Sequence, residues 1–259
     1  MAGITVGTAW GAIGFVTVRP VVPQQEGGAP AGRLGPLAAA EPLAVIGDIH
    51  GRADLLDRLL AALGEVAPGV RLVFLGDLVD RGPASREVLL RVQALTKTGA
   101  VALMGNHERM MRDFLADPAG AGRLWMMNGG AETLASFGID PHAYGPTALA
   151  ARLEAALGAS GLLSWLGERP LMWRSGNVVA VHALVAPERP LATQRERDLL
   201  WRRPSPADPP HREGVWIVHG HTVMPAPVIA PGYVRIDLGA WCTGNLCAAL
   251  IGTQRGRQP

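Results

Sequence analysis

The sequence predicts an α/β fold in which short buried strands alternate with amphipathic helices, and two observations favour this class. First, four-residue apolar runs end at glycine-flanked turns, as in Leu43–Ile46, Leu72–Leu75 and Val101–Met104. Second, the segments after the first two turns carry leucine and valine at helical spacing. In parallel sheets of this kind, ligands bind beyond the carboxyl ends of the strands, so the functional residues are expected at these turns.

Composition limits the function classes that the chain can serve. Its 259 residues are 48% hydrophobic and 18% charged, which indicates a folded protein with a large core. A net charge of +2 is too small to indicate a nucleic-acid partner. The two cysteines, Cys242 and Cys247, make no disulfide framework and are expected to be buried near a strand. A reducing compartment fits these cysteines, and we expect a cytoplasmic, monomeric protein without a membrane partner.

Residues 1–42 differ in composition from the remainder of the chain. Ile4–Val18 is uncharged but interrupted by glycine and threonine, and Val21–Ala40 is rich in proline, glycine and alanine. The first run is too short to cross a bilayer, and no basic segment precedes it. We expect residues 1–42 to form a flexible extension, with a misassigned start or a poor signal peptide as alternatives. Residues 43–259 are then one folded domain.

The first half of that domain is predicted to be mainly helical between its strands. Helices are expected over Ala53–Leu63 and over Ser85–Leu95, where Pro83 opens the second one. Residues 107–170 also show helical patterns, with breaks at Pro118, Gly120, Pro141 and Pro146. Methionines and tryptophans cluster here, and this cluster is expected to be core, with a wall of a substrate cleft as the alternative.

The second half returns to strands. A strand is expected to start near Leu171, and tight turns separate the later ones. The further predicted strands are Val178–Val181, Val215–Val218, Val228–Ile229, Val234–Leu238 and Leu246–Ile251.

Six polar residues sit at or just past the predicted strand ends. Singly, each is a weak signal, because Asp and Asn are common turn formers and a buried histidine is usually structural. Together, carboxylate, imidazole and amide groups suit divalent first-row metals such as Mn, Fe or Zn, and the absence of cysteine disfavours structural zinc. Six ligands exceed the need of one catalytic ion, which favours two ions and a bridging carboxylate. The set is Asp48, His50, Asp77, Asn106, His182 and His221.

The turn motifs carry a specific resemblance. They read Gly47-Asp48-x-His50-Gly51, Gly76-Asp77-x-x-Asp80-Arg81-Gly82 and Gly105-Asn106-His107-Glu108. In this order and spacing they resemble the metallophosphoesterases of the phosphoprotein-phosphatase type. That family includes bacterial Ser/Thr protein phosphatases, phage-type phosphatases and symmetrical dinucleoside tetraphosphatases. The resemblance covers about residues 43–251 and implies a four-layer α/β/β/α sandwich of two mixed sheets flanked by helices, with residues 43–259 as the catalytic domain.

The resemblance also implies the metal ligands, position by position. Two divalent ions are expected, most simply Mn²⁺, with Fe or Zn as alternatives. Asp48 and His50 would bind the first ion, and Asp77 would bridge both. The ligands of the second ion would be Asn106, His182 and His221.

Further residues match the catalytic groups of the family. His107 corresponds to the general acid, Asp80 to the carboxylate that orients it, and Arg81 to a phosphate-binding arginine. A second arginine is expected after the fourth motif, where Arg203 is the best match and Arg202 its rival.

The chemistry expected of this set is hydrolysis of a phosphoric ester. Two cations about 3.5–4 Å apart lower the pKa of a shared water and supply hydroxide for in-line attack on phosphorus. The most direct interpretation is a Ser/Thr protein phosphatase acting on phosphomonoesters. A dinucleoside polyphosphate hydrolase is the alternative, and a non-catalytic binding protein on the same fold is a second one. Nuclease activity fits less well. Specificity is expected to lie in residues 109–170 and 185–212.

Three further residues are interpreted structurally. Glu108 is expected to cap its helix, and His219 to lie outside the ligand set. Leu184 stands near His182 where many relatives have glycine, so crowding or an altered backbone angle is expected there.

Overall fold

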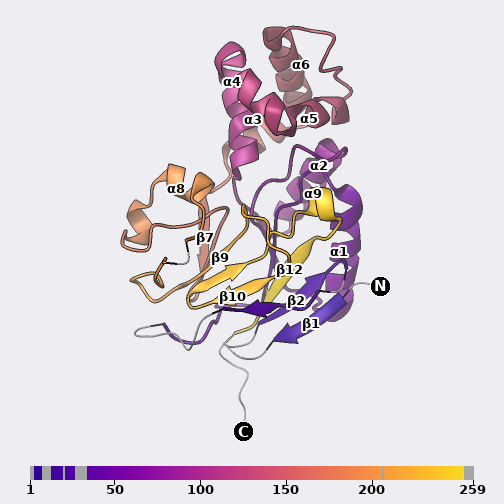
Figure 1. Cartoon of the computed structure of the whole chain (residues 1–259). Coiled ribbons are helices and arrows are strands. Elements are labelled where there is room, and N and C mark those ends of the chain that lie inside the picture. Colours follow the sequence, from indigo (N-terminus) through magenta and orange to yellow (C-terminus); the bar gives the residue numbers. More distant parts are fainter. Residues whose placement is uncertain (1–2, 8–12, 20, 27–33, 206, 254–259) are drawn as a thin grey trace.

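A computed structural model describes residues 3–7, 13–19, 21–26, 34–205 and 207–253. Two six-stranded mixed sheets pack face to face, with helices outside them (Figure 1). This confirms the predicted α/β class of two mixed sheets flanked by helices.

The first sheet contains the strands that lead to the three glycine turns. β4 (Leu43–Ile46), β5 (Arg71–Phe74) and β6 (Val101–Ala102) are parallel to one another. The other members pair antiparallel and complete the order β1-β2-β12-β4-β5-β6. They are β1 (Gly3–Gly7), β2 (Ile13–Thr17) and β12 (Cys247–Ile251).

The second sheet has the order β3-β10-β11-β9-β8-β7. Its central strands, β8 (Val178–Val181) and β9 (Trp216–His219), are parallel and lead to the two late histidines. The flanking strands are β3 (Gln24–Gln25), β7 (Met172–Ser175), β10 (Val228–Ala230) and β11 (Tyr233–Arg235).

Successive side chains along the central strands point to opposite faces of each sheet and so belong to different core layers. In β4, Val45 joins the cluster between the sheets, whereas Ile46 joins the cluster under the helices. In β8, Ala180 faces the space between the sheets, whereas Val179 belongs to a third cluster on the outer face. Each central strand is therefore buried on both faces, which explains why these strands read as continuous apolar runs.

Helices cover the outer face of the first sheet. α1 (Ala53–Val66) and α2 (Ser85–Thr96) share its core cluster with residues of the later helices. Figure 1 shows the later helices extending this layer beyond the strands. They are α3 (Asn106–Ala116), α4 (Pro118–Trp125), the π-helical turn η1 (Met126–Gly130), α5 (Ala131–Ser136) and α6 (Pro146–Ala159). A further helix, α7 (Leu162–Gly167), packs against α6 and α2.

The predicted helix breaks are mostly confirmed. Pro118 and Pro146 each begin a helix, and Pro141 lies in the turn between α5 and α6. The break expected at Gly120 is wrong, because Gly120 lies inside α4, where its N–H donates to the Asp117 carboxylate at 3.0 Å. None of the described helices has the length and apolarity that crossing a bilayer requires.

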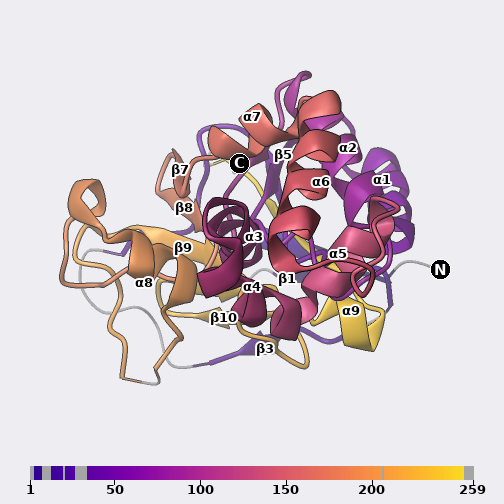
Figure 2. The same ribbon diagram turned by 90° about the horizontal axis from the view of Figure 1, so that it is seen from above.

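The outer layer of the second sheet is thinner. It contains the 3₁₀ turn η2 (Leu191–Thr193), the short helix α8 (Glu196–Trp201) and connecting loops. α8 lies on the opposite side of the molecule from α1 and α2 (Figure 2). A last short helix, α9 (Ala240–Thr243), follows β11 and precedes β12.

The flexible extension expected over residues 1–42 is wrong for the residues that the structure describes there. Residues 13–17 form a buried strand that pairs with β1 on one side and with β12 on the other. Leu37 is also buried, and Ala39 bridges to Thr253. Residues 13–17 pair with β12, which lies more than two hundred residues later in the chain. The local composition of residues 1–42 could not indicate so distant a partner. The assignment of 43–259 as the catalytic domain stays a prediction.

Candidate metal centre

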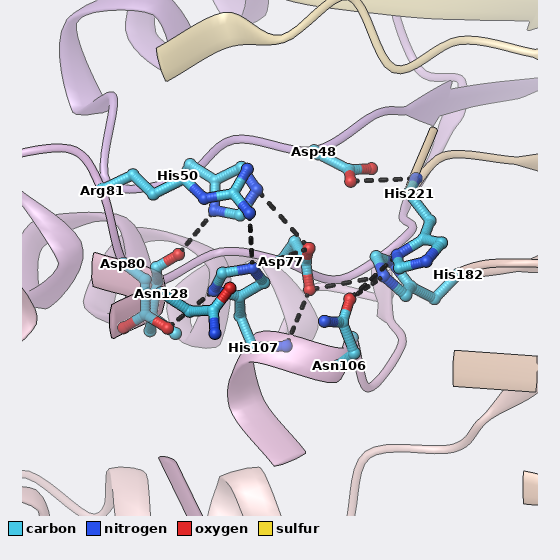
Figure 3. Close-up of polar contacts among 12 residues, drawn as sticks. Asp48, His50, Asp77, Asp80, Arg81, Asn106, His107, Asn128, His182 and His221 are labelled. Carbon is cyan, nitrogen blue, oxygen red and sulfur yellow. Dashed lines mark hydrogen bonds and ion pairs between the residues drawn. The ribbon is translucent and has the colours of Figure 1, made fainter. Parts of the chain in front are cut away.

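The six predicted ligands lie where the carboxyl ends of strands from both sheets meet (Figure 3). Asp48 and His50 follow β4, and Asp77 follows β5. Asn106 opens α3 just after β6, and the two histidines, His182 and His221, follow β8 and β9. Segments far apart in the sequence thus deliver polar groups to one place, as the strand-end pattern predicts.

The backbone at this place is held in an uncommon conformation. Among the described residues, five non-glycine residues have positive φ, between 48° and 70°. Each such residue costs roughly 1–3 kcal/mol unless its surroundings enforce it, and such residues cluster at functional sites. All five belong to the predicted site: His50, Asp77, Asp80, Arg81 and His221.

Asp77 lies at the centre of the cluster. Its Oδ2 is 3.5 Å from His50 Nε2, and its Oδ1 is 3.4 Å from His182 Nε2. The described residues include two groups whose ligand atoms all lie within 4.8 Å of one another, and Asp77 belongs to both. One group adds His50 and His107, and the other adds His182 and His221. Burial raises the pKa of Asp77, but the surrounding histidines outweigh it and hold the pKa well below its usual range.

The histidine tautomers suit metal binding. His50 Nδ1 lies 2.9 Å from the Val79 carbonyl oxygen, and His182 Nδ1 lies 3.1 Å from that of Leu75. A carbonyl only accepts, so both Nδ1 atoms carry the proton and both Nε2 lone pairs face Asp77. Burial lowers the pKa of His50 to about 3, so the ring is neutral at neutral pH. Lone pairs that converge on a carboxylate fit a cation between them.

Asn106 brings an amide oxygen to the second group. Its Oδ1 is 2.8 Å from His182 Nε2 and 3.0 Å from His221 Nδ1. Burial, followed by repulsion from His182, lowers the pKa of His221 to about 4. This group therefore offers neutral imidazoles, an amide and one Asp77 oxygen, a set that suits a divalent first-row ion.

Asp48 provides a second test of the metal interpretation. It is outside the two tight groups, and its Oδ2 accepts a hydrogen bond from the His221 N–H at 3.0 Å. Its Oδ1 is buried and has no hydrogen-bond partner among the described residues. Burial, with repulsion from Asp237 and Asp77, raises its pKa. A buried carboxylate oxygen without a donor is costly alone and favourable beside a cation, so the residues fit the implied ions.

His107 and Asp80 form a buried pair. His107 Nδ1 donates to Asp80 Oδ2 at 2.7 Å, and Thr133 and Trp125 donate to the same carboxylate at 2.7 and 3.1 Å. Burial lowers the pKa of His107, but Asp77 and Asp80 raise it more, and the net pKa is above the ordinary value. Arg81 Nη2 donates to His107 Nε2 at 3.0 Å. The hydrogen bond through which Asp80 is expected to orient His107 is therefore present in the structure.

A pocket opens onto the two groups. Arg203 lies in its wall, whereas its neighbour Arg202 forms an ion pair with Asp208. The geometry therefore favours Arg203 over Arg202 as the second predicted arginine. The lining residues are His50, Asp77, Arg81, Asn106, His107, Asn128, Trp201, Arg203, His221 and Asp237.

Glu108 has the structural role expected of it, but a wider one than capping α3. Its Oε2 accepts from the N–H groups of Gly105 and Asp77, both at 2.9 Å. Its Oε1 accepts from those of Leu78 and Val79, at 2.7 and 3.2 Å. One buried side chain thus holds the turns after β5 and β6 together. Burial raises its pKa to about 7.

We expect Glu108→Gln to lower the free energy of unfolding by about 2–4 kcal/mol, because the new amide group leaves two buried N–H groups without an acceptor. Urea denaturation of the metal-free protein measures this change. Glu132→Ala, on the exposed side of α5, is the control and should change stability by less than about 0.5 kcal/mol. Equal stability of both variants would contradict the role given to Glu108.

Leu184, which stands where many relatives have glycine, does not crowd the candidate metal centre. Leu184 is fully buried and packs with Val179 and Val185 in the outer cluster of the second sheet. It is absent from the residues with positive φ. The expected crowding or altered backbone angle is therefore wrong. His219 lies outside both ligand groups, as expected, and donates from Nδ1 to the Gly220 carbonyl oxygen.

Sequence reasoning missed four residues of the pocket and its rim. Asp237 was hidden because the strand was expected to run to Leu238, whereas β11 ends at Arg235 and leaves Asp237 in a loop two residues before Gly239. Asn128 lies in the π-helical turn η1, in an Asn-Gly-Gly sequence that marks an irregular helix. No local pattern distinguishes the other two, Trp201 and Trp241, from core tryptophans.

Asp237 resembles the predicted ligands in its setting. It is buried, lines the pocket, and accepts a hydrogen bond from the Gly239 N–H at 2.8 Å. Burial raises its pKa to about 6, and its charge raises the pKa of Asp48. Its negative charge at the Asp48 side of the centre favours a cation there.

We expect Asp237→Asn to weaken Mn²⁺ binding by about 10- to 100-fold, the range found when a group that supports metal ligands is removed. Isothermal titration of the metal-free protein with Mn²⁺ checks this expectation. Asp140→Asn, at an exposed turn, is the matched control and should bind as the parent does. An Asp237→Asn protein that binds within twofold of the parent would contradict it.

Comparison with known proteins agrees with this geometry. The sequence profile of the calcineurin-like phosphoesterases matches residues 41–245. A symmetrical bis(5'-nucleosyl)-tetraphosphatase of Janthinobacterium sp. (strain Marseille) is 31% identical over 163 residues, which are 61% of this chain and 51% of that protein. Serine/threonine-protein phosphatase 2 of Salmonella typhimurium is 28% identical over 215 residues, which are 78% of this chain and 89% of that protein.

Solved structures share the fold. One protein proposed to be a diadenosine tetraphosphatase gives a TM-score of 0.56 at 18% identity and covers 90% of this chain and 99% of its own. A cold-active protein-tyrosine phosphatase of a Shewanella species gives 0.51 at 14% identity, over 93% and 90%. The chain spans about half of the length of the tetraphosphatases that it matches. With a profile match over most of its residues, the chain belongs to the calcineurin-like phosphoesterase family.

Proposed function

We propose that the protein is a dinuclear metal-dependent hydrolase of phosphoric esters. One observation carries the proposal: Asp77 presents its two oxygens to two different groups of candidate ligands. Relatives in the family include both serine/threonine-protein phosphatases and dinucleoside tetraphosphatases. The proposed ligands are Asp48, His50, Asp77, Asn106, His182 and His221, with Mn²⁺ as the proposed metal.

Two divalent cations bound here would lower the pKa of a water molecule and attract the oxygens of a phosphoryl group. The remaining steps belong to the side chains. Arg81 and Arg203 lie in the pocket wall, where their guanidinium groups bind the non-bridging oxygens and stabilise the charge that grows on them.

His107 supplies the proton that the leaving oxygen needs. In the structure its Nε2 accepts a hydrogen bond from Arg81, so the ring is neutral there. When Arg81 turns to a phosphoryl group, Nε2 is released and takes up a proton, which the raised pKa favours. Asp80 keeps the ring in place through Nδ1, and Nε2–H then donates to the leaving oxygen as the P–O bond breaks.

The side chains and metals proposed to contact the phosphoryl group do not distinguish one phosphoric ester from another. Phosphoserine or phosphothreonine in a protein is the substrate first expected from the sequence, and a dinucleoside polyphosphate is the alternative. Both offer the same phosphoryl oxygens to the metals and arginines, so the choice between them depends on side chains farther out.

Hydrolysis of p-nitrophenyl phosphate by the purified protein tests the proposal. We expect activity with Mn²⁺ that is lost after chelation and restored by added metal. Inactivity with each of Mn²⁺, Fe²⁺, Zn²⁺ and Ni²⁺ would support a binding protein instead. Faster cleavage of bis(p-nitrophenyl) phosphate than of the monoester would support a nuclease-like diesterase.

A further inference from the structure

We propose that Trp201 and Trp241 form two aromatic subsites at opposite ends of the pocket and select phosphoric esters that carry nucleobases. This inference rests on the proposed hydrolase function and names the substrate class of the same site. It favours a dinucleoside polyphosphate over a phosphoprotein.

Trp201 stands at the end of the pocket that contains His221. It is the last residue of α8, lines the pocket, and keeps 41% of its surface exposed. Its ring meets the His221 ring edge-on, with centroids 6.3 Å apart. Glu196, at the start of the same helix, pairs with Arg109 of α3. The ring is therefore carried by a helix that is fixed to another element, and part of its surface is open to solvent.

Trp241 lies beside Arg81, a residue of the pocket wall. It lies in α9, is also 41% exposed, and its ring centroid is 5.0 Å from the guanidinium carbon of Arg81. Arg52 holds α9 by donating to the Ala240 carbonyl oxygen at 3.1 Å. In Figure 3, Arg81 and His221 lie at opposite ends of the cluster, with Asp77 between them. The two tryptophans therefore flank the place where the reacting phosphoryl group is expected.

The exposure of these rings sets them apart. Among the described residues they are the exposed tryptophans, whereas Trp125, Trp165 and Trp216 are buried. Other exposed apolar side chains lie close by in sequence to pocket residues. Met127 precedes Asn128 and is 74% exposed, and Val223 lies two residues after His221 and is 47% exposed. Half of the eight large apolar side chains that the described residues expose thus lie at or near pocket residues, where they are available to a substrate.

An aromatic ring at each end matches a particular ligand chemistry. Nucleobases stack on exposed tryptophans regardless of base identity, and each stack typically strengthens binding by about 5- to 150-fold. A dinucleoside polyphosphate has a base at each end and phosphates between, which matches two rings separated by the candidate metal ligands and two arginines. A phosphoserine or phosphothreonine side chain has no planar group for either ring.

Steady-state kinetics with Mn²⁺ test the inference on Trp201→Ala and Trp201→Phe. For diadenosine tetraphosphate, KM should rise about 10- to 100-fold in Trp201→Ala, with kcat changed much less, and Trp201→Phe should recover most of the loss. The ratio of kcat/KM for diadenosine tetraphosphate to that for a phosphoserine peptide should fall at least tenfold. Trp241→Phe, which keeps a ring over Arg81, should lower this ratio less than Trp241→Ala does.

Tyr144→Ala is the matched control, because Tyr144 is 42% exposed and its ring also covers an arginine, Arg152, away from the pocket. It should leave both substrates unaffected. An unchanged ratio in Trp201→Ala, or equal losses on both substrates, would overturn the proposal.

A binding measurement separates this proposal from the hydrolase proposal. Adenosine 5′-monophosphate, titrated into the metal-free protein, should quench tryptophan fluorescence, and Trp201→Ala should weaken its apparent affinity at least fivefold. This result stands even if the protein hydrolyses no ester. Absence of quenching in the parent protein would overturn the aromatic subsites and leave the hydrolase proposal intact.

Discussion

Asp77→Asn is expected to lower kcat for p-nitrophenyl phosphate by about 10³-fold or more. The carboxylate lies between both groups of ligands, and loss of its charge leaves each group with mostly neutral donors. Metal ions supply several kcal/mol of transition-state stabilisation, and each 1.4 kcal/mol is a factor of ten in rate. Initial rates at saturating Mn²⁺, with the metal content of the same samples, measure the effect.

The metal content should fall from two ions per chain to one or none in Asp77→Asn. Asp57→Asn is a suitable control, because Asp57 is an exposed aspartate on α1 that pairs with Arg91. It should keep both ions and full activity. An Asp77→Asn protein that retains two ions and a tenth of the parent rate would contradict the bridging role.

His107→Gln is expected to lower kcat by about 10²- to 10⁴-fold for an alkyl phosphate, the usual range for loss of a general acid. The loss should be much smaller for p-nitrophenyl phosphate, because nitrophenolate leaves without a proton. Rates on both substrates in parent and variant give the comparison. Asp80→Asn should show the same dependence on the leaving group, since Asp80 acts through His107 Nδ1.

The His107 prediction separates two roles. Equal losses on both leaving groups would show that His107 positions its neighbours and does not supply a proton. Such a positioning effect would act through the His107 ring, whose Nε2 lies 3.9 Å from Asp77 Oδ2.

The parts of the structure that local sequence encodes could be predicted. β4 and β8 match their expected ranges, and α1 and α2 differ by a few residues at their C-terminal ends. The convergence of the six candidate ligands was accessible for the same reason: a residue at the end of a parallel strand must lie at one edge of its sheet. The end of a strand can be recognised from local sequence. That the ends of β4, β5 and β6 lie together follows from the parallel pairing of these strands.

The parts that depend on distant partners could not be predicted. β2 is stabilised by pairing with β12, which is distant in sequence, and no residue pattern within Ile13–Thr17 predicts this pairing. Asp237 was missed because the ends of strands are hard to predict to within two or three residues, and the end of β11 decides whether Asp237 lies in a strand or in a loop. Trp201 and Trp241 look like core residues in sequence, and tertiary packing alone places them at the pocket rim.

If remote loops converge to hold two cations that share Asp77, anomalous diffraction from crystals grown with Mn²⁺ and phosphate will locate both ions. We predict two manganese peaks on either side of Asp77, one beside Asp48 and His50 and the other beside Asn106, His182 and His221. A single peak, or two peaks that do not share Asp77, would contradict the claim.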